Sequence, residues 1–245
     1  MNLLRFMAFL AACVLTSCID CHEEIWLAAD GSGHAQISYT LPAAAARFQG
    51  GEAGVRAMIG KFLADTTAIK TSSYQVTTEK DRLKIDVQAS FDSALDLKTV
   101  STGGSMTELP SSASSLAGKF EVASKGRTID FARTISPGSA LPGAGFMPAS
   151  AFDGHNLVYI IHLPMAAKES NATRTEDDGR TLVWDFPLAQ AITSPVSTRF
   201  KAEIPIPKSL IIASSFTILA AFWTGFLVIR KLRKIPRSGE STGVD

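Results

Sequence analysis

Alternating apolar and polar residues give the clearest structural signal in the middle of the chain. One run carries an apolar residue at every second position, with polar residues between: Leu83, Ile85, Val87, Ala89 and Phe91. This period of two is typical of a strand with one wall on a core and the other in water. The run follows residues 74–79 and the turn Lys80-Asp81, so it predicts the second strand of a hairpin.

The same reasoning predicts further strands and two helices. The predicted strands cover residues 24–29, 35–41, 120–122, 128–131, 156–163, 181–186 and 198–204. A first helix begins at Pro42, is interrupted at Gly50-Gly51 and continues amphipathically over residues 52–68. A second, short helix is capped by Asp92 or Ser93 and runs to Val100.

Two stretches rich in small residues, 102–116 and 136–154, predict loops. The order of elements mixes hairpins with helices and contains no regular βαβ units. It therefore predicts an α+β domain with a mostly antiparallel sheet and one or two packed helices.

The N-terminus has the pattern of a bacterial lipoprotein signal. Arg5 precedes an apolar run over residues 6–15, which is too short to cross a bilayer of about 30 Å. The run ends in Leu15-Thr16-Ser17-Cys18, which resembles a lipobox. We expect residues 1–17 to be removed and Cys18 to carry the lipid; a plain secretory signal is the alternative.

The cysteines fit this interpretation. Cys13 leaves with the signal and Cys18 is acylated, so Cys21 remains without a disulfide partner. We expect Cys21 to lie near a flexible start of the mature chain, as an incidental thiol or a second acylation site.

Residues 209–229 form an uncharged apolar segment that predicts a single transmembrane helix. Five residues, four of them basic, follow at 230–234, and positive residues remain on the cytoplasmic side. The alternative is a buried core helix. The predicted order is a signal peptide (1–17), an extracytoplasmic domain (18–208), a membrane span (209–229) and a basic cytoplasmic tail (230–245). The protein is expected in the inner (cytoplasmic) membrane, with lipid and helix entering from the same side.

Charge and motifs argue against several functions. The net charge of +1 gives no reason to expect a nucleic-acid partner. The sequence has none of the common hydrolase, metalloprotease or phosphate-loop motifs, so we expect no enzyme activity, no cofactor and no metal. The four histidines, His22, His34, His155 and His162, are scattered, and we expect His162 to be a core or edge residue rather than a ligand. Asp177-Asp178-Gly179 suits a turn better than a calcium site.

Three apolar residues in the second predicted loop are candidates for contact with a lipid or the membrane: Phe146, Met147 and Phe152. The alternative, which we favour, is that these side chains cover the domain's own core.

The whole layout resembles the LppM-like family of bacterial envelope lipoproteins. The resemblance rests on Cys18, the residues 27–33 (LAADGSG), the residues 179–188 (GRTLVWDFPL), and the C-terminal span with its basic tail. It implies a small α/β domain outside the cytoplasm, associated with lipid or glycolipid binding.

We therefore expect a non-catalytic, membrane-anchored lipoprotein whose domain binds a lipid or glycolipid. A protein-interaction or assembly component of an inner-membrane complex is the alternative. The expected partners are membrane lipid, a lipid or glycolipid ligand, and in the alternative an inner-membrane protein.

Overall fold

The structure is a computed structural model that describes residues 19–102, 111–140, 144 and 147–203. These residues all belong to one compact unit, Met1–Pro205. Cys18, the signal peptide, the span over 209–229 and the basic tail lie outside the described residues. Within the described ranges, no helix combines the length and the apolar character needed to cross a membrane.

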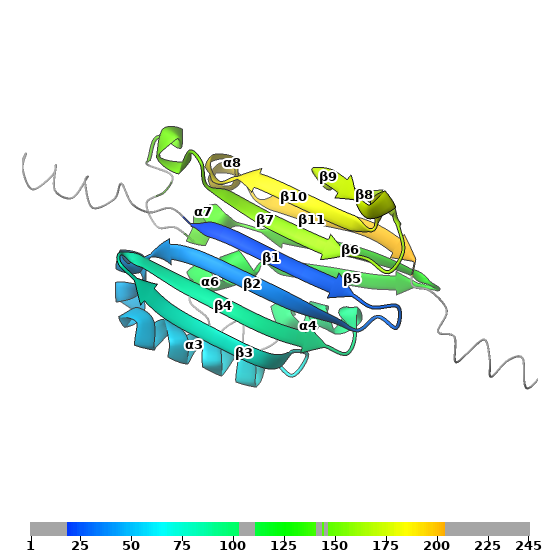
Figure 1. Cartoon of the computed structure of the whole chain (residues 1–245), viewed down its shortest axis with the longest axis horizontal. Coiled ribbons are helices and arrows are strands. Elements are labelled where there is room, and N and C mark those ends of the chain that lie inside the picture. Colours follow the sequence, from blue (N-terminus) through cyan, green and yellow to red (C-terminus); the bar gives the residue numbers. More distant parts are fainter. Residues whose placement is uncertain (1–18, 103–110, 141–143, 145–146, 204–245) are drawn as a thin grey trace, which may run out of the picture. The chain divides into compact units, whose positions relative to one another are not determined.

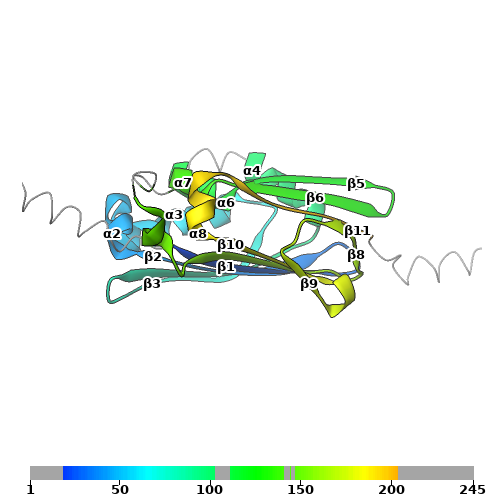
Figure 2. The same ribbon diagram turned by 90° about the horizontal axis from the view of Figure 1, so that it is seen from above.

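Two sheets build the domain. The larger, sheet A, has seven strands in the spatial order β3 (Lys70–Glu79), β4 (Arg82–Phe91), β2 (Gly33–Pro42), β1 (Asp20–Leu27), β7 (Asn156–His162), β10 (Thr181–Pro187) and β9 (Arg174–Glu176). The smaller, sheet B, has four: β5 (Lys119–Lys125), β6 (Thr128–Ile135), β11 (Val196–Glu203) and β8 (Ala167–Ser170). Figures 1 and 2 show the two sheets as facing layers.

Short helices join and flank the strands. The longest is α3 (Gly51–Asp65), which follows α2 (Ala43–Ala46) and the 3-10 turn η1 (Arg47–Gln49). The others are η2 (Ala94–Asp96), α4 (Leu97–Thr102), α6 (Ser111–Ala117), α7 (Pro137–Ala140), η4 (Ala149–Phe152), η5 (Asp177–Gly179) and α8 (Leu188–Thr193).

The inner face of sheet A is covered in two parts. Sheet B packs over its middle, where Leu157 and Trp184 of sheet A join one core with Phe131 and Phe200 of sheet B. Helix α3 packs over the β3–β4 side, where a smaller core forms around Val55, Val76 and Leu83. No α-helix of the described part covers the opposite, outer face of sheet A (Figure 2).

The predicted α+β class with mostly antiparallel strands is confirmed for the described residues, where all strand pairs but one are antiparallel. That exception is the parallel pair β1–β7, which joins residues far apart in the sequence. The strands form two sheets rather than the single sheet predicted. The predicted hairpin at Lys80-Asp81 is confirmed, with Lys80 at a φ of 58°. Ser93 caps the short helix as predicted, since its hydroxyl accepts a hydrogen bond from the Leu95 amide at 3.2 Å.

Several predictions for irregular segments were wrong. The end of the predicted loop 102–116 is helical, because α6 begins at Ser111. The second predicted loop, 136–154, contains α7 and η4. The first strand begins at Asp20 rather than at residue 24. Cys21 is therefore no part of a flexible start: it lies within β1 and is only 3% exposed.

Candidate functional site

Two neighbouring glutamates on β1 define two polar clusters on opposite faces of sheet A. Glu23 points inward, because it pairs in register with the buried Tyr159 of β7. Successive residues of a strand alternate between faces, so Glu24 points outward beside Ile160. Strand β1 thus supplies one carboxylate to the interior and a second carboxylate to the open face.

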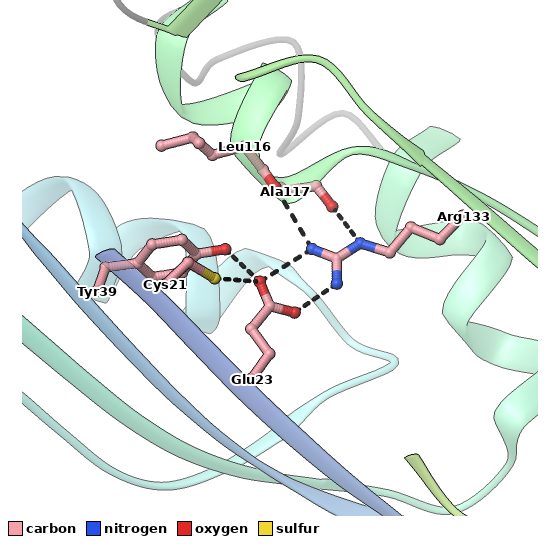
Figure 3. Close-up of polar contacts among 6 residues, drawn as sticks. All are labelled: Cys21, Glu23, Tyr39, Leu116, Ala117 and Arg133. Atoms are coloured by element: carbon pink, nitrogen blue, oxygen red, sulfur yellow. Dashed lines mark hydrogen bonds and ion pairs between the residues drawn. The ribbon is translucent and has the colours of Figure 1, made fainter. Parts of the chain in front are cut away.

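The inward cluster, here called the interlayer cluster, consists of Cys21, Glu23, Tyr39, Arg133 and Tyr159. The Glu23 carboxylate is held by Arg133 of sheet B through Nη1 and through Nη2, the latter at 3.1 Å. The Tyr39 hydroxyl donates to the same carboxylate, and the Cys21 thiol lies 3.8 Å from it (Figure 3).

Arg133 makes further contacts that use the rest of its guanidinium. Its Nε donates to the carbonyl of Ala117 at 2.9 Å, and Nη2 lies 3.4 Å from the carbonyl of Leu116. These carbonyls belong to the last turn of α6, where helix carbonyls lack partners within the helix. The guanidinium also lies 4.8 Å from the centre of the Phe120 ring and 5.3 Å from that of Tyr159. Glu23 and Arg133 thereby join the two sheets and α6.

Burial keeps the neutral groups of this cluster protonated. It raises the pKa of the Cys21 thiol, and the Glu23 charge adds to the effect. Burial likewise raises the pKa of the Tyr39 and Tyr159 hydroxyls. For Arg133, burial alone would lower the pKa, but the Glu23 carboxylate outweighs it and the net direction is upward. Cys21 therefore does not supply the thiolate that nucleophilic chemistry needs.

The outward cluster, here called the open-face cluster, consists of Glu24, Trp26, His34, His162 and Thr181. The indole of Trp26 is stacked between two imidazoles, with ring centres 4.6 Å from His34 and 5.1 Å from His162. Glu24 Oε1 lies 2.6 Å from His162 Nε2, and Thr181 Oγ1 lies 3.1 Å from His162 Nδ1. The stack follows from register, because His34, Trp26 and His162 lie side by side on β2, β1 and β7.

A surface hollow of about 390 Å³ adjoins the open-face cluster at the end of β1. Its lining combines apolar, hydroxyl and charged groups: Trp26, Leu27, His34, Ser90, Phe91 and Asp92. Gly33 matters for its shape, since a Cβ at this position would lie 2.4 Å from the Phe91 ring and 2.5 Å from the Trp26 carbonyl. The volume falls in the range of small-molecule sites, about 300–1,000 Å³.

The space between the layers is much smaller. An apolar hollow bounded by Leu27, Ile129, Leu163 and Phe200 holds only about 10 Å³. That is about the room of one water molecule, so an acyl chain does not fit there.

The structure places the predicted lipid-contact residues mostly in the core. Phe152 is 3% exposed and belongs to the main core, and Met147 is half-buried against it. Phe146 and Cys18 lie outside the described residues. Phe152 and Met147 therefore lie where the alternative interpretation of the sequence placed them, over the domain's own core.

The predicted turn and the remaining histidines have ordinary partners. Asp177 and Asp178 both have positive φ, 51° and 54°, in the predicted turn, and Asp177 accepts a hydrogen bond from Thr181 at 2.6 Å. His155 Nδ1 lies 2.8 Å from Asp20 Oδ1, and His22 Nε2 lies 3.8 Å from Glu24 Oε2. Over the described ranges, no group of three acidic, histidine or cysteine side chains could hold a metal ion.

The sequence reasoning missed the pair Glu23–Arg133. The signal was present on the strands themselves: Arg133 falls at an inward position of β6 between Phe131 and Ile135, and Glu23 falls between Cys21 and Ile25 on β1. Opposite charges at inward positions of two strands indicate a buried pair, because a lone buried charge is too costly.

Comparisons with known proteins add little. No protein-family model and no curated protein matches this sequence. The chain is similar to the solved folded domain of LppM from Mycobacterium tuberculosis, with a TM-score of 0.43, 9% identity, and coverage of 79% of this chain and 92% of that domain. It is also similar to the Fcho1 Mu homology domain of Danio rerio, solved with a bound Eps15 peptide, with a TM-score of 0.26, 10% identity, and coverage of 78% of this chain and 80% of that one. These likenesses are weak, so membership of the LppM-like family stays a prediction.

Proposed function

We propose that this protein is a non-catalytic, membrane-anchored envelope lipoprotein whose domain binds the headgroup region of a lipid or glycolipid at the open face of sheet A. The anchoring part of the proposal rests on the sequence. Leu15-Thr16-Ser17-Cys18 supplies the acylation site, and the uncharged residues 209–229 supply the span.

The hollow beside Trp26 and His34 is the observation that carries the binding part. Its mixed lining suits an amphiphile, because Trp26 offers apolar surface while Ser90, Asp92 and His34 offer hydrogen bonds. The apolar hollow between the layers is far smaller, at about 10 Å³. A ligand would therefore be held by its headgroup at the surface rather than by chains inside the sandwich.

The polar groups of the domain support a binding role over a catalytic one. The thiol of Cys21 is buried and its pKa is raised by that burial, so it is no ready nucleophile. His162, the histidine with the most polar contacts, is already engaged by Glu24 and Thr181.

The alternative function, a protein-interaction or assembly component, is favoured by the outermost strand of sheet A. β3 has ten residues, and among the described strands it pairs only with β4, so its other side offers backbone groups to an added strand. Crosslinking in cells from a photoreactive residue at Gln75 on β3 would recover a stoichiometric protein if this function is the main one.

The binding proposal is tested by titrating the full chain in nanodiscs with dihexanoylphosphatidylglycerol below its micelle concentration, and with the free sugar headgroups of glycolipids. We expect saturable binding of at least one probe, weakened by Trp26→Ala and by His34→Ala. Thr134→Ala, on the outer face of sheet B, is the matched control and should leave binding unchanged. Absence of saturable binding, or equal binding by the Trp26→Ala variant, contradicts the proposal.

A further inference from the structure

The two ends of the described domain lie at opposite ends of strand β1. The chain enters at Ile19, just before Asp20 begins β1. It leaves at Glu203, which lines the same hollow as Leu27 and Ala28 at the other end of β1. From Ile19 to Leu27 the chain covers about 26 Å at the rise of a strand.

The two tethers differ in length. Cys18 is the residue next to Ile19, and Ile19 is fixed in the core at 3% exposure. The lipid on Cys18 can therefore reach a bilayer only where the start of β1 itself lies at the bilayer surface. On the other side, the chain from Glu203 to Ser209 spans at most about 22 Å when fully extended.

From these lengths we infer that the domain lies with the outer face of sheet A against the bilayer, an inference that rests on the anchoring part of the proposed function. An upright domain, with only the start of β1 at the membrane, would place Glu203 about 26 Å away, beyond the reach of its tether. With the outer face of sheet A down, sheet B lies about 10 Å further out and Glu203 remains within reach.

In the remaining orientations, Cys18 would lie too far from the bilayer for its lipid to insert. β1 is the fourth of seven strands, so resting on either edge of sheet A raises it by three strand spacings, about 14 Å. Resting on sheet B raises it by the spacing between the sheets, about 10 Å, and by the outer side chains of sheet B as well. A single residue between the lipid and the core does not bridge either gap.

The surface chemistry of the outer face suits the polar surface of a bilayer. Three of its carboxylates have a basic partner: Asp20 with Arg82, Asp86 with Lys84, and Glu24 with His162. Trp26 lies on this face, and tryptophan is favoured at membrane interfaces. The hollow beside Trp26 then faces the headgroups of the membrane that anchors the protein, so its ligand is a lipid of that same leaflet.

The test uses the lipidated full chain in vesicles of phosphatidylethanolamine and phosphatidylglycerol that carry a quencher on some headgroups. A fluorophore is attached at Gln36→Cys, on the outer face of sheet A, or at Thr134→Cys, on the outer face of sheet B. Buried Cys21 does not compete for the label. We expect the label at residue 36 to lose most of its fluorescence and the label at residue 134 to keep most of it. Equal quenching, or the reverse order, overturns the inference.

A tether variant separates orientation from binding. Inserting about 12 glycine and serine residues between Cys18 and Ile19 gives a root-mean-square reach of about 20 Å, which should equalise the two labels. A difference that persists in this variant also overturns the inference, because tether length would then not set the orientation. If the labels behave as expected while dihexanoylphosphatidylglycerol does not bind, the orientation stands and only the binding activity fails.

Discussion

Glu23 and Glu24 are neighbours in the sequence, yet their carboxylates have two different kinds of partner. Glu23 is 3% exposed and bonds to Arg133 between the layers. Glu24 and its partner His162 have side chains 25% and 28% exposed on the open face. The comparison teaches that the face of the strand, and not the residue type, decides whether a carboxylate stabilises the fold or remains accessible for recognition.

The largest expected effect follows from breaking the buried pair. Arg133→Met leaves the Glu23 carboxylate buried without its partner, which costs about 3–5 kcal/mol in the free energy of unfolding. Urea denaturation of the variant measures the loss. Arg199→Met, at an exposed position of the adjoining strand β11, is the control and should change stability by at most about 0.5 kcal/mol. Equal losses in the two variants would contradict the role given to Arg133.

A second variant tests whether the loss comes from the unpaired charge. Adding Glu23→Gln to Arg133→Met removes the buried charge but keeps an oxygen that accepts the Tyr39 hydrogen bond. The double variant should recover part of the stability, because coupled residues depart from additivity by about 0.5–3 kcal/mol. The same urea experiment decides this, and a further loss instead of a recovery would show that the charge was not the cause.

The hairpins were predictable from sequence because their signals are local. In β4 every second residue is apolar and the turn directly precedes the strand, so the period of two was enough. The start of β1 was missed for the opposite reason. Its inward Glu23 looks like a surface residue until its partner, 110 positions away, is known.

The predictions for the irregular segments were wrong because the structure of these segments depends on contacts with residues distant in the sequence. The serine-rich α6 has weak helical propensity of its own, and its last carbonyls are satisfied by Arg133 of β6. The short strands β8 and β9 have four and three residues, too few for a readable period. The open-face cluster could not be predicted from the sequence either, because the His34–Trp26–His162 stack forms only when three strands are in register.

Alkaline pH should also act on the inner face, where burial raises the pKa of Cys21, Tyr39 and Tyr159. The unfolded chain ionises Cys21 near its ordinary pKa of 9.0 and Tyr39 near 10.0, whereas the folded protein, in which burial raises both pKa values, does not. Stability is thus fully present below these values and falls as pH rises above them, by about 1.4 kcal/mol per pH unit for each group. Thermal unfolding at graded pH measures the fall. Tyr39→Phe should make it less steep above pH 10, while Tyr74→Phe, at a side chain 40% exposed, should not.

The smallest expected effect is that of Glu24→Gln. It is most informative beside Glu23→Gln, the same substitution on the other face of β1. Glu24→Gln removes the charge from a half-exposed pair, and such pairs contribute about 0.2–1 kcal/mol. Glu23→Gln leaves the Arg133 guanidinium buried without a counter-charge, so its loss should be several times larger. Chemical denaturation of the two variants side by side, at neutral pH, gives both values. Losses of similar size would mean that the two faces of β1 do not differ in the way their burial implies.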